Sequence, residues 1–468
     1  MPSPLSIAFQ GAARTVTGSR HKIRFGERTW LFDCGLYQGR REEADHVNRT
    51  FAFAPEEIDT VVLSHAHLDH TGNLPTLVSR GFAGRVHSTA ATAELSQFML
   101  ADSAHLMARD VEYVHRHPHG RPPYEPLYGP DDVATTMSRF EHHDYHQPWD
   151  LFEGVQVEYF NAGHILGAAL TTFEFKDGGR TLRLGMSGDL GRPARPILRD
   201  PEHHPGVEVL VLESTYGDRV HRPGPESEDE LAGIVERTAA RGGRLLVPAF
   251  AVGRTQELVA TLHALCGRGR ACDLPIFVDS PMAREATGVF VRHPECFDEE
   301  TREAFTKEHG APFGFARLRY VGSPDESRSL NDREEPCIII AASGMCEGGR
   351  ILHHLRHGLS DPKNTVLFVG FQAEGTLGRR LRDGMSPVNI FGEPVEVKAE
   401  IAAIDGFSAH ADQHELLSWV TGLAPAPRRI FLVHGELAAA EALARELRAR
   451  TPAEVRIPEK NEEFDLWN

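Results

Sequence analysis

The sequence contains no long apolar run. Nowhere does it reach the roughly 18 consecutive apolar residues that a membrane-spanning helix needs. The N-terminus also lacks a basic region followed by an apolar stretch and a cleavage site, which together mark a secretory signal. We therefore expect a cytoplasmic protein with no membrane partner.

Cysteine is scarce and scattered. The six cysteines form no C-x-x-C pair, which argues against a zinc ribbon and against a disulfide framework. Two phosphate-binding signatures are absent as well, because the chain has neither a G-x-G-x-x-G loop nor a Walker-type lysine loop. These absences argue against dinucleotide and nucleoside triphosphate binding.

Positive charge is in short supply. The chain has 50 Lys and Arg residues against 67 Asp and Glu residues, a formal net charge of -17. Such a balance disfavours non-specific binding to nucleic acid, because phosphate contacts need cationic groups. Net charge does not set local charge, however. Metal ions and arginines gathered in one cleft can form a positive groove, so a polynucleotide substrate stays open.

The composition and the strand and helix patterns indicate an α/β protein. A chain of 468 residues with 41% hydrophobic residues can form two or three domains, or one domain with a large insertion. The opening, over 5–10, 21–25 and 29–33, predicts a β-meander. After an acidic, proline-containing stretch at 221–230, helices alternate with short buried strands, which predicts a parallel sheet covered by helices. These later strands are expected at 244–248, 275–278, 337–341 and 366–370.

The densest group of chemically active residues directly follows a short apolar strand at 60–63. His65, His67, Asp69 and His70 lie within six positions. Neutral imidazole nitrogens and an ionised carboxylate are ready ligands for a divalent ion near neutral pH. His65 and His67 are two residues apart, so an extended backbone points both the same way. Asp69 and His70 are adjacent to each other and are expected to hold a second ion.

Five further candidates lie beside small residues, and most of them follow strands. His164 comes after the strand at 155–160, Asp189 after the strand at 182–187, and Glu213 after the strand at 207–212. His410 and His434 lie near the end of the chain, His434 directly after an apolar strand. Side chains at strand ends of one sheet edge can converge on a common point.

Weaker candidates depend on less specific patterns. Asp33 closes the third strand and is either a turn residue or a group that orients a ligand histidine. Ser343, Gly344 and Arg254 lie at glycine-marked strand ends, where parallel sheets bind ligands. We consider these three as phosphate contacts, with ordinary turn chemistry as the alternative.

Taken together, these motifs resemble the metallo-β-lactamase superfamily, and more narrowly its β-CASP branch of nucleic-acid-processing nucleases. The resemblance covers almost the whole chain, including the loop at 11–19 and the segment at 343–345. It implies an αββα sandwich with an inserted β-CASP domain, divided as 1–212, 213–396 and 397–468. The superfamily ligand motifs are matched by His65-x-His67-x-Asp69-His70, His164 and Asp189. The three motifs of the β-CASP branch are matched by Glu213, His410 and His434.

Carried over by position, the resemblance implies two zinc ions, with manganese as an alternative. The first would be held by His65, His67 and His164, the second by Asp69, His70 and His434, with Asp189 bridging and Asp33 supporting the ligands. A hydroxide bridging the two metals would attack the phosphodiester bond and leave a 5′-phosphate and a 3′-hydroxyl. Asp69, Asp189, Glu213 and His410 would act in catalysis, with His410 donating a proton and Glu213 keeping it protonated.

The histidine at 434 favours RNA as the substrate, because DNA-repair members of the branch usually have valine there. Single-stranded RNA suits a cleft between two domains better than a stiff duplex does. The leading hypothesis is therefore a ribonuclease of RNA processing or decay that cuts internally or from an end, and a homodimer is the expected assembly. The alternatives are a DNA-directed nuclease of the branch, a small-molecule metallo-hydrolase, and a silent RNA-binding subunit.

Overall fold

The computed structural model describes residues 3–39, 41–116, 125–270, 274–307, 313–370, 372 and 375–468. The chain packs into two compact units. The first unit comprises Met1–Pro193, Asp200–Val220 and His410–Asn468, and the second comprises Ala194–Arg199 and His221–Ala409. Domain boundaries were expected at 212/213 and 396/397, whereas the packing separates the units near 220/221 and 409/410. The second boundary lies later in the chain than expected because residues 400–403 pair with the sheet of the second unit.

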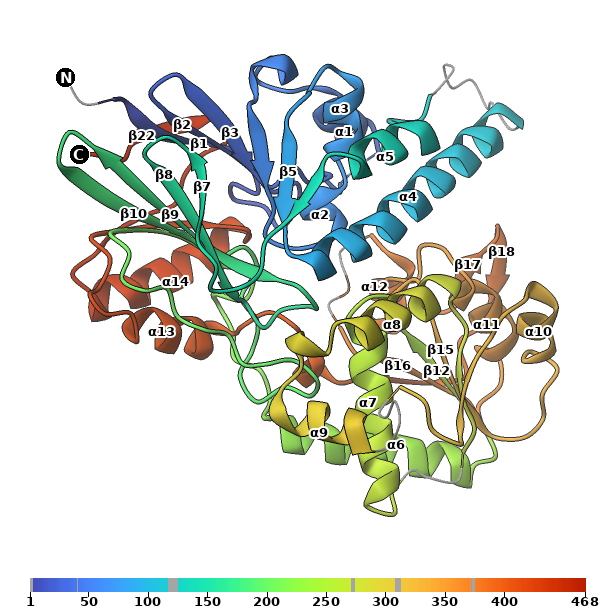
Figure 1. Ribbon diagram of the computed structural model, residues 1–468. Coiled ribbons are helices and arrows are strands. Elements are labelled where there is room, and N and C mark those ends of the chain that lie inside the picture. Colours follow the sequence, from blue (N-terminus) through green and yellow to red (C-terminus); the bar gives the residue numbers. More distant parts are fainter. Residues whose placement is uncertain are drawn as a thin grey trace. The chain divides into compact units, whose positions relative to one another are not determined.

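The first unit contains two seven-stranded sheets. The first sheet has the order β22-β1-β2-β3-β4-β5-β6 and the second the order β21-β20-β11-β10-β9-β8-β7 (Figure 1). The strands of the first sheet are β1 (Leu5–Gly11), β2 (Arg20–Phe25), β3 (Arg28–Phe32), β4 (Thr60–Val62), β5 (Arg85–Ser88), β6 (Phe140–His142) and β22 (Glu462–Asp465). The strands of the second sheet are β7 (Trp149–Phe152), β8 (Val155–Asn161), β9 (Ala169–Asp177), β10 (Arg180–Met186), β11 (Val209–Glu213), β20 (Arg429–Val433) and β21 (Glu454–Arg456).

Apolar side chains from both sheets form one core between them. Phe9 and Trp30 from the first sheet and Phe173 and Phe431 from the second belong to this cluster and are fully buried. On the other side of the first sheet, Leu77 of α3 joins a separate apolar cluster with residues of β3, β4 and β5. In Figure 1, α13 and α14 lie beside the second sheet. The helices of this unit are α1 (Arg41–Arg49), η1 (Pro55–Glu57), α2 (Leu68–Thr71), α3 (Leu74–Ser79), α4 (Ala90–Arg116), α5 (Pro130–Met137), α13 (Gln413–Thr421) and α14 (Leu437–Arg450).

The burial of strand β11 reflects the four layers of this unit, in which helices cover the outer faces of two packed sheets. All five of its residues are buried, which requires cover on both faces of the second sheet. Leu210 and Leu212 point to one face while Val209 and Val211 join the core between the sheets. The predicted αββα sandwich is confirmed.

The second unit is built on a six-stranded sheet with the order β14-β13-β15-β12-β16-β19, in which every described pairing is parallel. One apolar cluster covers one face with residues of α6, α7 and α8, and another covers the opposite face with residues of α11 and α12. The predicted parallel sheet covered by helices is confirmed. The strands of this unit are β12 (Arg244–Pro248), β13 (Ile276–Val278), β14 (Leu318–Tyr320), β15 (Cys337–Ala341), β16 (Thr365–Phe368), β17 (Val388–Ile390), β18 (Glu393–Val395) and β19 (Glu400–Ala403). Its helices are α6 (Gly224–Ala240), α7 (Arg254–Gly267), α8 (Pro281–Arg292), η2 (Pro294–Cys296), α9 (Glu299–Lys307), α10 (Pro324–Ser329), α11 (Ile351–Gly358), α12 (Leu377–Arg382) and η3 (Asp405–Phe407).

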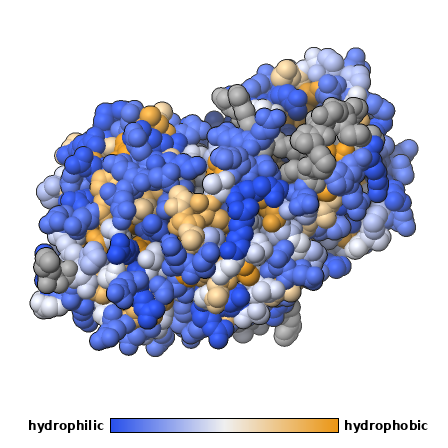
Figure 2. All heavy atoms as spheres, turned by 90° about the horizontal axis from the view of Figure 1, so that it is seen from above, coloured by the Kyte–Doolittle hydropathy of each residue, from blue (hydrophilic) through white to orange (hydrophobic). Residues whose placement is uncertain are grey.

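The surface seen in Figure 2 is mostly hydrophilic, with apolar residues in small separate groups. Among the described helices, none is both long and apolar enough to cross a lipid bilayer.

Candidate metal centre

Parallel pairing brings three predicted site residues to one edge of the second sheet. Strands β10, β11 and β20 run side by side and parallel, so their carboxyl ends lie together. Glu213 is the last residue of β11 and pairs with Val433, the residue before His434. Asp189 follows the end of β10 by three residues. The fold therefore places Asp189, Glu213 and His434 near one another.

The first sheet supplies five further side chains in the same way. Strands β3 and β4 are parallel, so Asp33 after β3 lies near the turn that follows β4. That turn carries His65 and His67, and the short helix α2 carries Asp69 and His70.

Glycine allows the two sheets to approach closely beside these residues. Gly188, next to Asp189, has a φ of +53°, and a Cβ there would lie 2.5 Å from the Cβ of Ser64. A larger residue would therefore force the carboxyl end of β10 away from the turn after β4.

Four side chains form the first donor group. His65 Nε2 lies 3.0 Å from His67 Nδ1, and His164 Nε2 lies 3.3 Å from the same His67 atom. Asp189 Oδ2 lies 3.5 Å from both His65 Nε2 and His164 Nε2. All four residues offer ligand atoms within 4.8 Å of one another.

The second donor group lies on the other side of Asp189. His70 Nε2 is 3.2 Å from His434 Nε2 and 3.3 Å from Asp189 Oδ1. Asp69 Oδ2 is 3.3 Å from His434 Nε2. Each oxygen of Asp189 therefore faces a different group, which is the arrangement expected of a bridging carboxylate.

The spacing of these atoms fits metal coordination. Donors placed about 2.0 to 2.1 Å from an ion at the corners of a tetrahedron are about 3.3 Å apart. The separations of 3.0 to 3.5 Å within the first group match that edge. Within the described chain, Asp189 Oδ1 is buried and has no hydrogen-bond donor. A buried carboxylate oxygen without a donor is costly, and a cation would satisfy it.

The protonation states of the first donor group suit metal ligands. Burial, together with the neighbouring imidazole of His70, lowers the pKa of His65 well below its ordinary value. Burial lowers the pKa of His67 to about 4 and that of His164 well below its ordinary value. These three imidazoles are therefore neutral at pH 7 and offer lone pairs. Burial raises the pKa of Asp189, but the surrounding imidazoles outweigh burial and hold it well below the usual range.

Asp33 holds His70 of the second donor group through the ring nitrogen that faces away from the group. His70 Nδ1 donates to Asp33 Oδ2 at 2.7 Å, which turns Nε2 toward the donor group. Burial lowers the pKa of His70, but the charges of Asp189 and Asp33 outweigh burial and raise it well above its ordinary value, so a bound cation would displace the Nε2 proton. The backbone N-H of Ser64 donates to Asp33 Oδ1 at 2.8 Å, and the Ser64 hydroxyl donates to Oδ2 at 2.9 Å. Asp33 and His434 both have positive φ, 62° and 48°. Such backbone costs about 1 to 3 kcal/mol per residue and persists where surrounding contacts fix it.

Two positioning residues were missed in the sequence. The Ser64 hydroxyl lies 3.0 Å from His65 Nδ1, and the Thr215 hydroxyl lies 3.2 Å from His434 Nδ1. Each fixes the second nitrogen of a histidine in the donor groups. Ser64 precedes His65 directly and Thr215 is two residues after Glu213, but hydroxyl residues at strand ends are too common for such positions alone to identify them.

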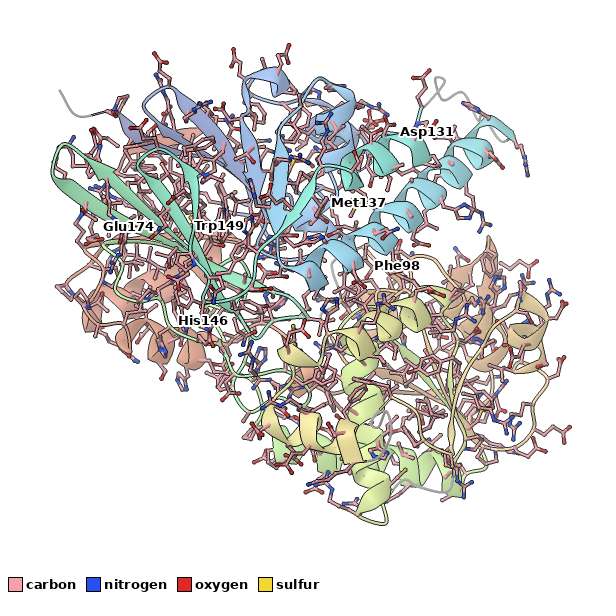
Figure 3. All side chains as sticks on the ribbon, viewed as in Figure 1. Phe98, Asp131, Met137, His146, Trp149 and Glu174 are labelled. Carbon is pink, nitrogen blue, oxygen red and sulfur yellow. The ribbon has the colours of Figure 1, made fainter. Side chains whose placement is uncertain are left out.

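We expect Asp33→Asn to weaken metal binding by about 10- to 100-fold, the usual cost of losing a partner behind a metal ligand. An amide cannot accept from both His70 and Ser64 as the carboxylate does. Titration of metal-free protein with zinc, followed by calorimetry, measures the change. Asp131→Asn, at an exposed position labelled in Figure 3, is the matched control and should bind metal normally. Unchanged affinity in Asp33→Asn would contradict this role.

His410 and Glu213 form a pair beside the donor groups. His410 Nδ1 lies 3.1 Å from both carboxylate oxygens of Glu213, 3.9 Å from Asp189 Oδ2, and its ring centroid is 4.6 Å from that of His164. Burial lowers the pKa of His410, but the charges of Glu213 and Asp189 outweigh burial and raise the pKa to about 9. His410 is therefore protonated at neutral pH.

The backbone around His410 is held firmly. The Ala411 N-H donates to the Leu190 carbonyl at 2.8 Å, and the Leu190 N-H donates to Glu213 Oε1 at 2.6 Å. One loop thus holds both members of the pair. The next residue, Asp412, caps helix α13 in a capping box with Glu415.

The three weaker candidates all lie in the second unit. The Ser343 hydroxyl accepts from the N-H groups of Glu347 and Gly348 at 3.1 and 3.3 Å, so it closes its own loop. Arg254 forms an ion pair with Glu257. These contacts give Ser343 and Arg254 structural partners, and phosphate binding by them stays a prediction. A Cβ on Gly344 would meet the ring of Phe250 at 3.0 Å.

Comparison with known proteins identifies the family. The model for the metallo-beta-lactamase superfamily matches residues 23–215, the Beta-Casp domain matches 255–381, and the Zn-dependent metallo-hydrolase RNA specificity domain matches 394–458. Ribonuclease TTHA0252 of Thermus thermophilus is 40% identical over 91% of this chain and 92% of its own length. The chain belongs to the β-CASP branch of the metallo-β-lactamase superfamily. As a member of this branch it is a metal-dependent hydrolase, in agreement with the two donor groups.

Other β-CASP relatives are longer. Transcription termination factor FttA of Methanocaldococcus jannaschii is 32% identical over 92% of this chain and 67% of its own length. FttA of Pyrococcus horikoshii is 34% identical over 81% of this chain and 57% of its own length. A solved structure of a protein of unknown function from Enterococcus faecalis V583 matches with a TM-score of 0.58 and 12% identity, over 99% of this chain and all of that one. That likeness supports the fold alone.

Proposed function

We propose that this chain is a metal-dependent ribonuclease that hydrolyses phosphodiester bonds of single-stranded RNA and leaves a 5′-phosphate and a 3′-hydroxyl. The observation that carries the proposal is the pairing of two donor groups through Asp189 with the protonated His410 beside them. RNA is favoured as the substrate because a ribonuclease is 40% identical over nearly the whole chain. The histidine at 434 favours RNA as well, because it resembles the RNA-acting members of the branch.

The donor set suits two zinc ions, with manganese as an alternative. His65, His67 and His164 would hold the first, and Asp69, His70 and His434 the second, with Asp189 shared. When bound, the ions supply an activated water and neutralise negative charge on the reacting phosphate. Histidine nitrogens and carboxylate oxygens are the ligands that zinc commonly takes in hydrolases.

The chain's own residues complete the reaction. A water oxygen bonds to phosphorus as the bond from phosphorus to the 3′-oxygen breaks. The departing 3′-oxygen takes a proton from His410, which yields the 3′-hydroxyl. Glu213 holds His410 through Nδ1, and the His410 side chain remains 21% exposed, so its Nε2 can reach the substrate. Asp189 and Asp69 would hold the ions and so set the position of the attacking water.

Chelation tests the proposed function. Protein stripped with a chelator should lose RNA cleavage, and zinc or manganese added back in about twofold excess over protein should restore it. The readout is cleavage of 5′-labelled single-stranded RNA on a denaturing gel. Cleavage that survives complete metal removal would contradict the proposal. Restoration by magnesium alone would contradict the zinc assignment, because magnesium prefers all-oxygen ligands.

A homodimer and a location in the cytoplasm stay predictions of the sequence. Phosphate contacts by Ser343, Gly344 and Arg254 also stay predictions of the sequence.

A further inference from the structure

A third group of potential metal ligands lies outside the catalytic residues, on the edge of the first sheet. It consists of His87 on β5, Glu141 on β6 and His143 just after β6. Their ligand atoms lie within 4.8 Å of one another.

Strand register explains why these three side chains meet. Strands β5 and β6 are parallel, and His87 pairs directly with Glu141. Directly paired residues put their side chains on the same face of a sheet. The His143 N-H donates to the Ser88 carbonyl at 2.9 Å, so the pairing continues past β6. His143 is two residues beyond Glu141 and therefore points to the same face, whereas His142 points to the other.

The two imidazoles are close and held in place. His87 Nδ1 lies 2.9 Å from His143 Nε2. The His143 ring stacks on Trp149, with centroids 3.8 Å apart and an interplanar angle of 9°. Trp149 is the first residue of β7 in the second sheet and is labelled in Figure 3. This stacking fixes the orientation of one ligand before any ion binds, which lowers the ordering cost of binding.

Both rings are suited to accept a cation. Burial, followed by the effect of His143, lowers the pKa of His87 to about 4. Burial also lowers the pKa of His143. Both are therefore neutral at pH 7, and Glu141 is an exposed acidic side chain beside them. Two neutral imidazoles and one carboxylate form the ligand set of a His₂Glu zinc site, which keeps a fourth position for water.

A hydrogen bond between the two imidazoles is the simpler explanation of the 2.9 Å separation. Two observations favour a metal site over this hydrogen bond. His65 and His67 in the catalytic group show the same kind of approach, 3.0 Å between ring nitrogens. A hydrogen bond between His87 and His143 also needs no carboxylate, yet Glu141 is paired with His87 on the shared face.

We propose that His87, Glu141 and His143 bind a further divalent ion, Zn²⁺, separate from the catalytic pair. The ion would link β5, the segment after β6 and, through the stacked ring, the first residue of β7. It would thus fasten the edge of the first sheet to the second. This assignment is independent of the catalytic residues and does not require that the substrate be RNA.

Zinc content measures this site directly. Full-length protein, free of any histidine tag, is equilibrated in a zinc-buffered solution, and bound zinc per chain is determined by mass spectrometry of the metal. His143→Phe keeps an aromatic ring against Trp149 but removes the ligand nitrogen, so it should hold one zinc fewer than the wild type. His142→Phe makes the same change at the exposed neighbour on the opposite face and should match the wild type.

Glu141→Gln tests the third ligand with an isosteric change on the surface. Its affinity for the additional zinc should fall at least tenfold, while RNA cleavage by both variants stays at the wild-type level. Equal zinc content in His143→Phe and wild type would overturn the proposal. Loss of zinc in His143→Phe with normal affinity in Glu141→Gln would overturn the three-ligand site. Anomalous diffraction at the zinc edge should place a peak among the three side chains, and no peak there would also overturn the proposal.

Discussion

His410→Ala is expected to lower kcat for RNA cleavage by about 10²- to 10⁴-fold, the usual contribution of a positioned proton donor. The metal content should stay at the wild-type level, because His410 pairs with Glu213 and is not needed to complete either of the two main donor groups. Single-turnover cleavage of labelled RNA, with bound metal determined on the same samples, measures both quantities.

The neighbouring histidine supplies the matched control for this experiment. His414 is exposed near the start of α13, and His414→Ala should cleave RNA at the wild-type rate. Glu213→Gln should also reduce kcat, since the amide no longer offers His410 a negative charge. A fall in activity that merely follows a loss of metal in His410→Ala would assign His410 to metal binding and contradict its role as the proton donor.

Asp189→Asn is expected to reduce RNA cleavage to the level of chelated protein. The two oxygens of Asp189 face different donor groups, so its loss weakens the binding of both proposed ions together. An amide supplies one neutral oxygen in place of two charged ones, while the imidazoles remain. Bound zinc should therefore fall from about two equivalents at the catalytic groups to less than one, as measured by metal analysis after dialysis.

Variants that remove a ligand from only one donor group give the zinc content with which Asp189→Asn is compared. His164→Ala touches only the first group and His434→Ala only the second, so each should lose about one equivalent. Asp218→Asn, at an exposed carboxylate, should lose none. If Asp189→Asn lost no more metal than His164→Ala does, the carboxylate would not be shared, and the bridging assignment would fail.

Much of the fold could be predicted because buried strands and long helices leave strong local patterns. The strands at 244–248 and 337–341 have the bounds expected from their apolar runs. The strand Glu400–Ala403 was not assigned to the second unit. Its sequence shows an apolar stretch, but its parallel pairing with β16 depends on contacts distant in sequence.

For a similar reason, the residues of the candidate site could be predicted but the contacts between their atoms could not. His65, His67, Asp69 and His70 form a dense motif, and the structure brings them together with His164, Asp189 and His434 as proposed from the resemblance. Which nitrogen or oxygen faces which partner could not be predicted. The hydroxyls of Ser64 and Thr215 each contact Nδ1 of a histidine and so fix the orientation of its ring. These contacts form only in the folded chain.

Comparison of RNA with DNA as substrates tests whether this metal centre cuts RNA. Metal-loaded protein is incubated with single-stranded RNA and with DNA of the same sequence, both labelled at the 5′ end, and the ends of the products are identified. We expect cleavage of the RNA, little cleavage of the DNA, and products with 5′-phosphate and 3′-hydroxyl ends. Intact RNA with metal bound would contradict the proposed ribonuclease activity and favour a small-molecule metallo-hydrolase, while preferential cleavage of DNA would favour a DNA-directed nuclease.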